Sequence, residues 1–524
     1  MNISLLLHTV SHLRPKQVVY QVFYRVYKPR YKKRIAPKQL VNKNLSVSPI
    51  AREYCWDEMN NTFIFLHLKD KFGGWNDTSK GMLWTYNLNY MDWLNQQDIP
   101  VVEGIYWINK FITDLPNNHI GLDPYPIALR GINWMKFILC HQEELDKQTM
   151  GRWHDSLYAQ YLLLSKKLEY HLMGNHLLED AYSLYMAALY FEDQVFFSKA
   201  SRLLLRELKE QVLPDGAHYE QSPMYHCILL DRLLDCYNFS INMNCFPEQQ
   251  KINSQLKNFA IRMLGHLQNI VYRDGTIPLL NDSAYGIAPV PAKIFNYASS
   301  LGLIWNEIVM KDCGYRKFYN GQMEAIVDVG NLAASYQPGH SHADTFNYEL
   351  RIAGKPFIVD TGISTYNKTK RRLYERSTAA HNTVTVNNRD SSEVWSGFRV
   401  ARRAKVTCLE DTCKVVKALH DGFGKGRLHI RTFQMSETFF TITDAVSSND
   451  QSISYIHLAP HIEIQSVTAQ TVITNCGIID ISNALDVEIV DGKVSTTYNT
   501  FQSSKIIKIH FIKEMKYRIK QEVL

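Results

Sequence analysis

The chain has 524 residues, of which 45% are hydrophobic, 21% charged and 12% aromatic, and its formal net charge is +7. This length exceeds what one compact core usually holds, so two or three domains are expected. Residues 1–52 contain eleven Lys and Arg and no Asp or Glu. Because the rest of the chain is therefore slightly acidic, the composition excludes a nucleic-acid footprint over the whole protein.

The basic character is concentrated in residues 1–50, which we treat as a separate N-terminal segment. It contains KPRYKKR at 28–34. Such a run is typical of a solvated face, but it also suits weak contact with an acidic polymer or a membrane surface.

Targeting signals are weak. No run of 18 or more apolar residues is present, so no transmembrane segment is predicted. The start, MNISLLLHTVSHLRPK, lacks the basic n-region and the cleavage site of a secretory signal. Nine scattered cysteines without a CxxC pair predict neither a disulfide framework nor a cysteine zinc site. We expect a cytoplasmic location, with the periplasm as the alternative.

Residues 51–320 show helical spacing of apolar residues. The segments 153–172, 178–213 and 225–243 repeat apolar residues three and four apart, with short breaks such as MGNH, LPDG and RDGTIP between such segments. Serial amphipathic helices bury their faces against each other, which predicts a helical bundle or toroid.

Residues 321–524 change to a period of two. Runs such as FNYELRIAG, HNTVTVNN and SSKIIKIHFI alternate apolar and polar residues between turn signals. This pattern predicts an all-β domain of many strands, most simply an antiparallel sandwich.

Three stretches of the helical half contain candidate functional groups. GNHLLED (174–180) places Asn175 and His176 at a helix start, where helix capping by Asn175 is the ordinary interpretation. LPDGAHYEQSPMYH (213–226) is a polar, aromatic loop that includes Tyr225. The third stretch is DPYPIALRGINWMKF, which contains Tyr125, Arg130, Asn133 and Trp134. In it an arginine could hold a carboxylate and a tryptophan could stack on a sugar ring, or both could simply pack.

The β half contains GHSHADT at 339–345. His340 and His342 would share a face if this stretch were extended. Asp360 ends one apolar strand and His381 begins another. Two histidines and one carboxylate are a common zinc set, and the alternative is a group of ordinary strand-end polar residues.

Several motifs, taken together in order, resemble the heparinase II/III family of bacterial polysaccharide lyases, which also includes oligoalginate lyases. They span about residues 80–405 and are WTYNLNYMDWL, DPYPIALRGINWMKF, GNHLLED, LPDGAHYEQSPMYH, IPLLNDSA, QPGHSHADTFNYEL, VDTGISTY, ERSTAAHNTV and SSEVWSGFRVARRA. The resemblance implies an incomplete (α/α) toroid followed by an antiparallel β-sandwich. This is an α+β multidomain chain, as the two periodicities also indicate.

The resemblance implies catalytic roles for four residues. Asn175 would neutralise a uronate carboxylate, and His176, Tyr225 and His340 would form the acid/base set. Arg130, Asn133, Trp134 and Tyr125 would lie near the substrate.

The resemblance also implies a structural zinc ion bound by His342, Asp360 and His381, and no organic cofactor. The zinc would brace the loop that holds His340. His340 would then face the substrate and His342 the zinc, which requires the backbone to turn between the two histidines of GHSHADT. Tyr374, with Arg371 nearby, would reach the substrate.

The implied reaction is β-elimination in an anionic polysaccharide or oligosaccharide. Removal of the weakly acidic C5 proton of a uronate needs stabilisation of the carboxylate, a base at C5 and an acid at O4. Three alternatives stay open at this point: a C5 epimerase or a capsule-processing enzyme on the same scaffold, a non-catalytic glycan-binding protein, and a glycosidase. A glycosidase would need a carboxylate pair, for which the candidates are Glu179, Asp215, Glu220 and Asp282. A homodimer is a further possible assembly.

Overall fold

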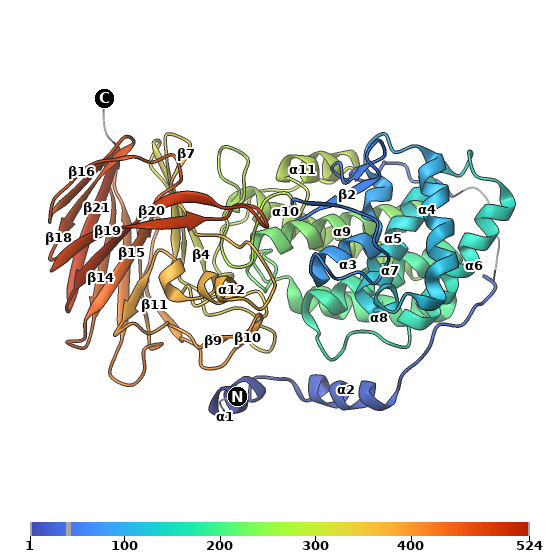
Figure 1. Cartoon of the computed structure of the whole chain (residues 1–524), viewed down its shortest axis with the longest axis horizontal. Helices are drawn as coiled ribbons and strands as arrows, with labels where there is room; N and C mark the ends of the chain where they lie inside the picture. The colour runs from blue at the N-terminus through green and yellow to red at the C-terminus, as the bar shows by residue number, and fades with distance from the viewer. Residues whose placement is uncertain (1–2, 38–42, 522–524) are drawn as a thin grey trace.

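The computed structural model describes residues 3–37 and 43–521. Parts of the predicted N-terminal segment (1–2 and 38–42) and of the predicted β domain (522–524) lie outside these residues. Within them, the chain forms a helical region and a β region side by side, with the two N-terminal helices along one edge of the molecule (Figure 1).

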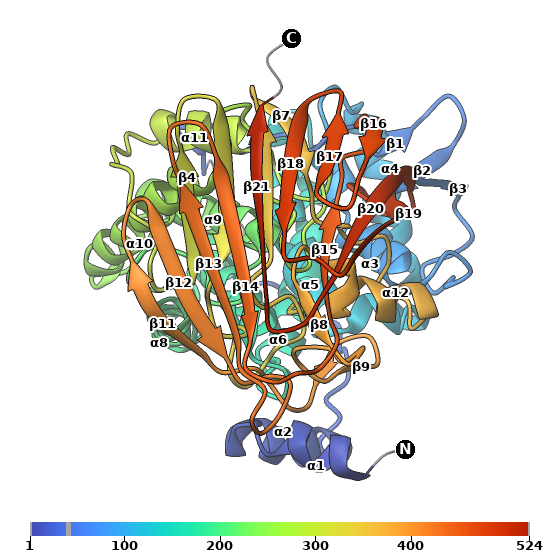
Figure 2. The same cartoon turned by 90° about the vertical axis from the view of Figure 1, so that its left-hand side faces the viewer.

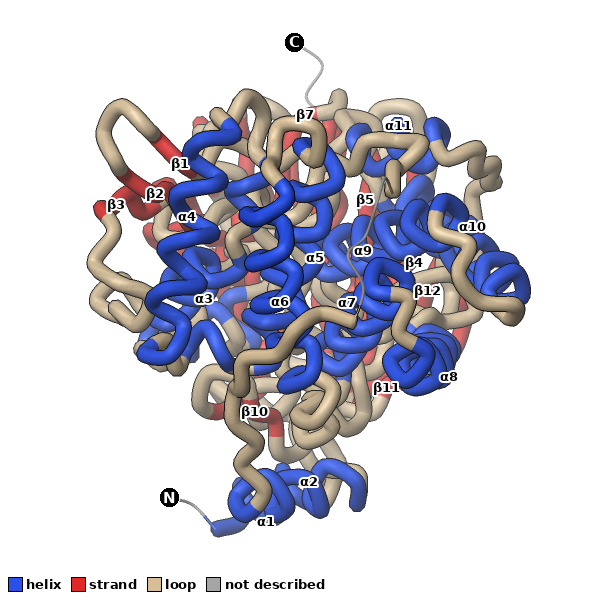
Figure 3. The backbone as a smooth tube through the Cα atoms, turned by 90° about the vertical axis from the view of Figure 1, so that its right-hand side faces the viewer, coloured by secondary structure: helices blue, strands red, loops and turns tan. Residues whose placement is uncertain are grey.

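In the part of the chain that the structure describes, the helical region contains nine α-helices. They are α3 (Met82–Tyr90), α4 (Val101–Asp114), α5 (Pro124–His141), α6 (Lys147–Leu164), α7 (Gly174–Phe191), α8 (Gln194–Gln211), α9 (Pro223–Asn242), α10 (Gln249–Ile270) and α11 (Pro291–Ser300). Local sequence explains several starts: the Asp146 and Asp193 side chains cap α6 and α8, and Ser222 caps α9 ahead of Pro223. The helices enclose one large apolar core, and α7, buried on nearly all sides, lies at its centre (Figure 3).

Among the described residues, the β region contains three large antiparallel sheets and a two-stranded one formed by β9 (Val394–Trp395) and β10 (Arg399–Val400). An eight-stranded sheet has the order β11-β12-β13-β14-β21-β18-β17-β16, and two four-stranded sheets have the orders β19-β20-β15-β8 and β4-β5-β6-β7 (Figure 2). The strands of the large sheet are β11 (Val406–Asp411), β12 (Val415–His420), β13 (His429–Met435), β14 (Phe440–Val446), β16 (Ile464–Val467), β17 (Thr471–Thr474), β18 (Gly477–Ser482) and β21 (Glu514–Gln521). Those of the smaller sheets are β4 (Tyr315–Tyr319), β5 (Met323–Asp328), β6 (Tyr348–Ile352), β7 (Lys355–Ile358), β8 (Val384–Val386), β15 (Ser452–His457), β19 (Asp486–Val494) and β20 (Gln502–Phe511).

A second apolar core joins these sheets face to face. Phe357 from β7, Phe433 and Phe440 from β13 and β14, and Ile507 from β20 are all buried in it. Alternate residues of β12 and β13 point inward, as the period of two predicts. The predicted fold class, a helical toroid followed by an antiparallel β-sandwich, is therefore confirmed.

Three local features were not predicted. The β region begins at Tyr315, inside the range expected to be helical, because β4 pairs with β5. A small sheet of β1 (Trp56–Asp57), β2 (Thr62–Phe65) and β3 (Leu68–Lys71) precedes the first toroid helix. The basic N-terminal segment contains two helices, α1 (Ile3–Val10) and α2 (Pro15–Val26). Among the described helices, none is long and apolar enough to cross a membrane.

Polar contacts lock the two regions together. Arg351 of β6 forms an ion pair with Asp274, in the turn after α10. Glu349 of the same strand accepts a hydrogen bond from the Tyr272 hydroxyl at 3.0 Å. The loop that follows α10 is thereby held against β6, the strand that comes directly after the GHSHADT segment.

Candidate active site

The GHSHADT segment forms the irregular connection between β5 and β6, and both of its histidines contact one carboxylate. His340 Nδ1 lies 3.0 Å from Asp282 Oδ2, and His342 Nε2 lies 2.8 Å from Asp282 Oδ1. The backbone N–H of Asp282 also donates to the His340 carbonyl at 3.1 Å. Because the segment is not a strand, the two rings reach Asp282 from a turning backbone.

Asp282 is held as an anion. The buried Arg372, in the short helix α12 (Lys370–Glu375), donates to both carboxylate oxygens at 2.5 and 2.8 Å. Burial opposes the charge, but the Arg372 guanidinium and the two histidine hydrogen bonds hold the pKa of Asp282 well below its usual range. An ionised carboxylate only accepts hydrogen bonds, so His340 donates from Nδ1, and in the neutral ring the lone pair is then on Nε2.

Tyr225 lies against this histidine. It sits in the first turn of α9, and the centroids of its ring and the His340 ring are 3.9 Å apart with an interplanar angle of 31°. Its hydroxyl lies 3.2 Å from the hydroxyl of Tyr366. Burial, with the nearby carboxylates of Asp282 and Glu220, raises the pKa of Tyr225 above its ordinary value. Tyr225 is therefore a proton donor at neutral pH.

Glu220 connects this pair to the start of α7. Its Oε1 accepts a hydrogen bond from the backbone N–H of Asn175 at 2.9 Å, and its Oε2 lies 3.6 Å from His340 Nε2. Gly174, the residue before Asn175, has a φ of +60°, and a Cβ at this position would lie 2.5 Å from Glu220 Oε1. Asn175 does not cap the helix, since α7 begins at Gly174 after Met173. Its side-chain amide makes no hydrogen bond to any residue in the described part of the chain.

His176 extends the site on the side of the helical region. Its Nδ1 lies 2.9 Å from Glu169 Oε2, and its ring packs against Tyr125 with centroids 4.5 Å apart. Burial would lower the pKa of His176, but the Glu169 carboxylate outweighs it and raises that pKa. The structure thus brings Asn175, His176, Tyr225 and His340 to the junction of the two regions, with Tyr125 beside them.

Three predicted substrate contacts are corrected by the structure. Arg130 is fully buried and donates to the Gln160 side chain and to two backbone carbonyls. Trp134 is also fully buried, with its indole N–H 3.3 Å from Met91 Sδ. Asn133 is 3% exposed and donates to a backbone carbonyl of α3. All three face the helical core, where they fix α5 against its neighbours.

The structure places Tyr374 on α12, where the Arg371 guanidinium lies 5.3 Å from its ring centroid. Arg371 itself is paired with Glu375 at 2.7 Å. Neither residue has a contact with the histidines of the site among the described residues.

The residues predicted to bind zinc are all fully buried, and two of them fit a metal. The rings of His342 and His381 have centroids 5.2 Å apart. His342 Nδ1 and His381 Nε2 have no hydrogen-bond partner, while the other nitrogen of each ring faces a carboxylate. This is how metal-binding histidines are usually oriented. Asp360 lies 2.8 Å from His381 Nδ1, the ring nitrogen opposite the unpartnered Nε2. In this geometry Asp360 orients the His381 ring and is not itself a metal ligand.

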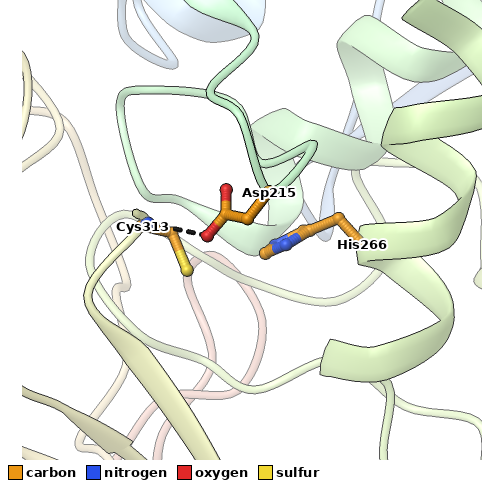
Figure 4. Close-up of side chains that lie close together, drawn as sticks. All are labelled: Asp215, His266 and Cys313. Atoms are coloured by element: carbon orange, nitrogen blue, oxygen red, sulfur yellow. Dashed lines mark hydrogen bonds between the residues drawn. The ribbon is translucent and has the colours of Figure 1, made fainter. Parts of the chain in front are cut away.

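Within the described residues, the one group of three metal-ligand side chains whose ligand atoms all lie within 4.8 Å of one another is Asp215, His266 and Cys313 (Figure 4). Asp215 accepts hydrogen bonds from the backbone N–H groups of Lys311 and Cys313 at 2.9 and 2.8 Å. It also accepts one from Ala217 at 3.2 Å. These bonds satisfy the carboxylate and tie the loop before α9 to the start of the β region.

The carboxylates considered for a glycosidase do not form an acid and base pair. Asp282 is held ionised by Arg372, and Asp215 braces a loop. Glu179 is buried behind the site, 3.7 Å from Arg232, and burial raises its pKa to about 7. Glu220 caps the start of α7.

Sequence reasoning missed Arg372, Tyr366 and Glu169, and it considered Asp282 only as a hydrolase carboxylate. Arg372 follows another arginine in the run KTKRRLYER. Nothing in that run distinguishes the one that folds inward, since the distinction depends on packing against Asp282, 90 residues away.

Comparisons with known proteins place the chain in a family. The description "Heparinase II/III N-terminus" matches residues 132–301, and "Heparinase II/III-like, C-terminal" matches residues 305–521. The heparin-sulfate lyase of Pedobacter heparinus is 28% identical over 250 residues, covering 41% of this chain and 36% of that protein. The heparin-sulfate lyase of Bacteroides stercoris is 22% identical over 335 residues, covering 56% and 47%.

These alignments span less than half the length of either curated relative. Among solved structures, the crystal structure of heparinase III superposes with a TM-score of 0.70 at 13% identity, over 96% of this chain and 89% of that one. At this identity the structural likeness establishes the fold. Because the two family descriptions together match most of the helical and β regions, the chain belongs to the heparinase II/III family.

Proposed function

We propose that the protein is a polysaccharide lyase that cleaves uronic-acid-containing anionic glycans by β-elimination. The observation that carries this proposal is the pairing of His340, whose Nε2 lone pair is set by Asp282, with the protonated Tyr225 hydroxyl on an adjacent ring. A base and an acid side by side are what elimination across C5 and C4 requires.

In this reaction His340 Nε2 takes the C5 proton. The C–H electrons form the C4–C5 double bond, the C4–O4 bond breaks, and Tyr225 gives its proton to the leaving O4. Asp282 holds the imidazole in the required tautomer and stabilises its positive charge after proton transfer.

The start of α7 suits the uronate carboxylate. A helix N-terminus favours negative charge, and the Asn175 amide is without a hydrogen-bond partner among the described residues. Burial opposes protonation of His176 beside it, but the Glu169 carboxylate raises the pKa of that ring and so favours its charged form. These groups would stabilise the enediolate as charge moves onto the carboxylate.

The test is ultraviolet absorbance during incubation with a panel of uronate glycans, beginning with heparan sulfate because the curated relatives are named heparin-sulfate lyases. The conjugated double bond of the product absorbs, and intact glycans do not. We expect a rise that is lost in Tyr225→Phe and His340→Ala and kept in the control Tyr319→Phe. Among the described residues, the hydroxyl of Tyr319 has one hydrogen-bond partner, the Gly321 carbonyl.

A second candidate, a C5 epimerase, would remove the same proton and return one to the opposite face. His176 could supply that second proton, since it approaches from α7 and is the most exposed histidine of the site. Proton exchange at C5 in heavy water, without a rise in absorbance, would identify the protein as an epimerase and exclude the lyase reaction.

We also propose that His342 and His381 hold a zinc ion that braces the His340 loop, with Asp360 orienting His381. When bound, the ion would supply a fixed cross-link and no step of the reaction. Metal analysis should find about one zinc per chain, lost in His342→Ala and in His381→Ala and kept in the exposed control His461→Ala. An unchanged zinc content in both variants would show that the metal binds at another site.

A further inference from the structure

The helices α1 and α2 lie outside the body of the molecule and bridge its two regions (Figures 1 and 3). The Trp395 indole N–H of the β region donates to Thr9 Oγ1 at 2.9 Å. On the other side, the Tyr24 hydroxyl and the Gln17 amide donate to backbone carbonyls of the loop before α7, at 2.7 and 3.1 Å. These contacts fix which faces of the two helices point away from the protein.

The outward faces are aliphatic, which reverses the usual pattern of a surface helix. The inner side of α2 contains Gln17, Tyr20 and Tyr24, whereas the outer side is rich in valine. We call the exposed apolar set the N-terminal face; it consists of Ile3, Leu7, Val10, Val18, Val19, Val22, Phe23 and Val26.

Exposure of this face is high. Val19 is 61% exposed, Val26 84%, and Ile3 72%. Their spacing by three, four and seven residues aligns them along each helix. Exposed apolar residues elsewhere are mostly scattered singly, so this is a contiguous patch of the kind that marks a binding surface.

The chain next to the N-terminal face is strongly basic. Arg25 lies in the last turn of α2, and the extended segment after this helix exposes further cations, which are Lys28, Arg30, Lys32, Lys33 and Arg34. None of them forms an ion pair with a described residue, and residues 1–52 contain no Asp or Glu.

We propose that the N-terminal face docks on an anionic lipid bilayer, with its aliphatic side chains among the headgroups and residues 25–34 on the lipid phosphates. Amphipathic helices with a basic flank bind such surfaces while lying in the plane. A second copy of the chain would bring two unpaired positive clusters together. A glycan would be expected to meet aromatic rings, and this face is mainly Val, Ile and Leu.

The test is co-sedimentation of the full chain with vesicles of phosphatidylcholine alone or with one part in three of phosphatidylglycerol. We expect binding to the anionic vesicles only, weakened at high salt. Val22→Ser/Val26→Ser should weaken it about tenfold, and Lys28→Gln/Lys32→Gln/Lys33→Gln by at least tenfold. The control Val102→Ser/Val195→Ser changes equally exposed valines on α4 and α8 (69% and 74%) and should bind normally.

Three outcomes would overturn the proposal. One is no binding to anionic vesicles at low salt. Another is binding that survives the valine substitutions, which would make it a charge effect without insertion. The third is a dimer, seen by analytical ultracentrifugation without lipid and dissolved by Val22→Ser/Val26→Ser, which would identify the face as a contact between copies. None of these readouts depends on lyase activity.

Discussion

Replacing Asp282 by Asn should separate the catalytic from the structural role of the buried charge cluster. The side chain keeps its shape but loses its charge, so the fully buried Arg372 is left without a counter-ion. Breaking a buried pair in this way costs about 3 kcal/mol in the free energy of unfolding. The amide can also present N–H to His340, which removes the acceptor that fixes its tautomer, and kcat should fall about 10³-fold.

Asp444 offers a matched control. It is also fully buried and also accepts from an arginine and a histidine, Arg431 at 2.6 Å and His429 at 2.7 Å, but inside the β-sandwich. Asp444→Asn should lose a similar amount of stability in urea denaturation while the folded protein keeps its kcat. The double variant Asp282→Asn/Arg372→Met should regain most of the stability, since no unpaired charge remains, without regaining activity.

Ultraviolet product formation and urea unfolding are measured on the same preparations. A kcat of Asp282→Asn within threefold of the parent protein would refute the assignment of Asp282 as the residue that orients His340. Equal losses of kcat in the Asp282 and Asp444 variants would show that stability alone sets activity.

Further variants test other parts of the structure. Gly174→Ala should abolish activity because its Cβ would displace Glu220, whereas Gly275→Ala, at a similar positive φ with nothing within 4 Å, should cost only about 1 kcal/mol of stability. Arg130→Met should change the thermal stability but leave KM unchanged, as expected for a side chain in the core. A large rise in KM would instead show that Arg130 contacts the substrate. Burial opposes ionisation of Asp444, but Arg431 lowers its pKa. Its stabilisation is therefore complete above about pH 4 and lost as pH falls through the depressed value, so Asp444→Asn should flatten the acid limb of stability against pH.

The two-part architecture follows from periodicity alone. Apolar spacing near 3.6 requires helices that bury one stripe, and spacing of two requires sheets that bury one face. The same reasoning fails near Tyr315, where a short strand belongs to the sheet because of its partner β5 and not because of its own pattern.

Local sequence could also nominate polar residues at element ends, such as Asn175, Tyr225 and His340. It could not tell such residues from Arg130 and Trp134, which have equally suitable chemistry but lie in the core. Burial depends on how α5 packs against its neighbours, and this helix is buried on nearly all sides.

What the sequence by itself determined was the type of each region and the chemical groups available to a site. Only the tertiary structure decided that Asp282, Arg372 and His340 form one cluster, because this buried carboxylate is held ionised by side chains 58 and 90 residues away in the sequence. It also decided that the valines of α2 face outward. A helix pattern defines an apolar stripe, but the side of the helix that packs is chosen by contacts such as that of Tyr24 with the loop before α7.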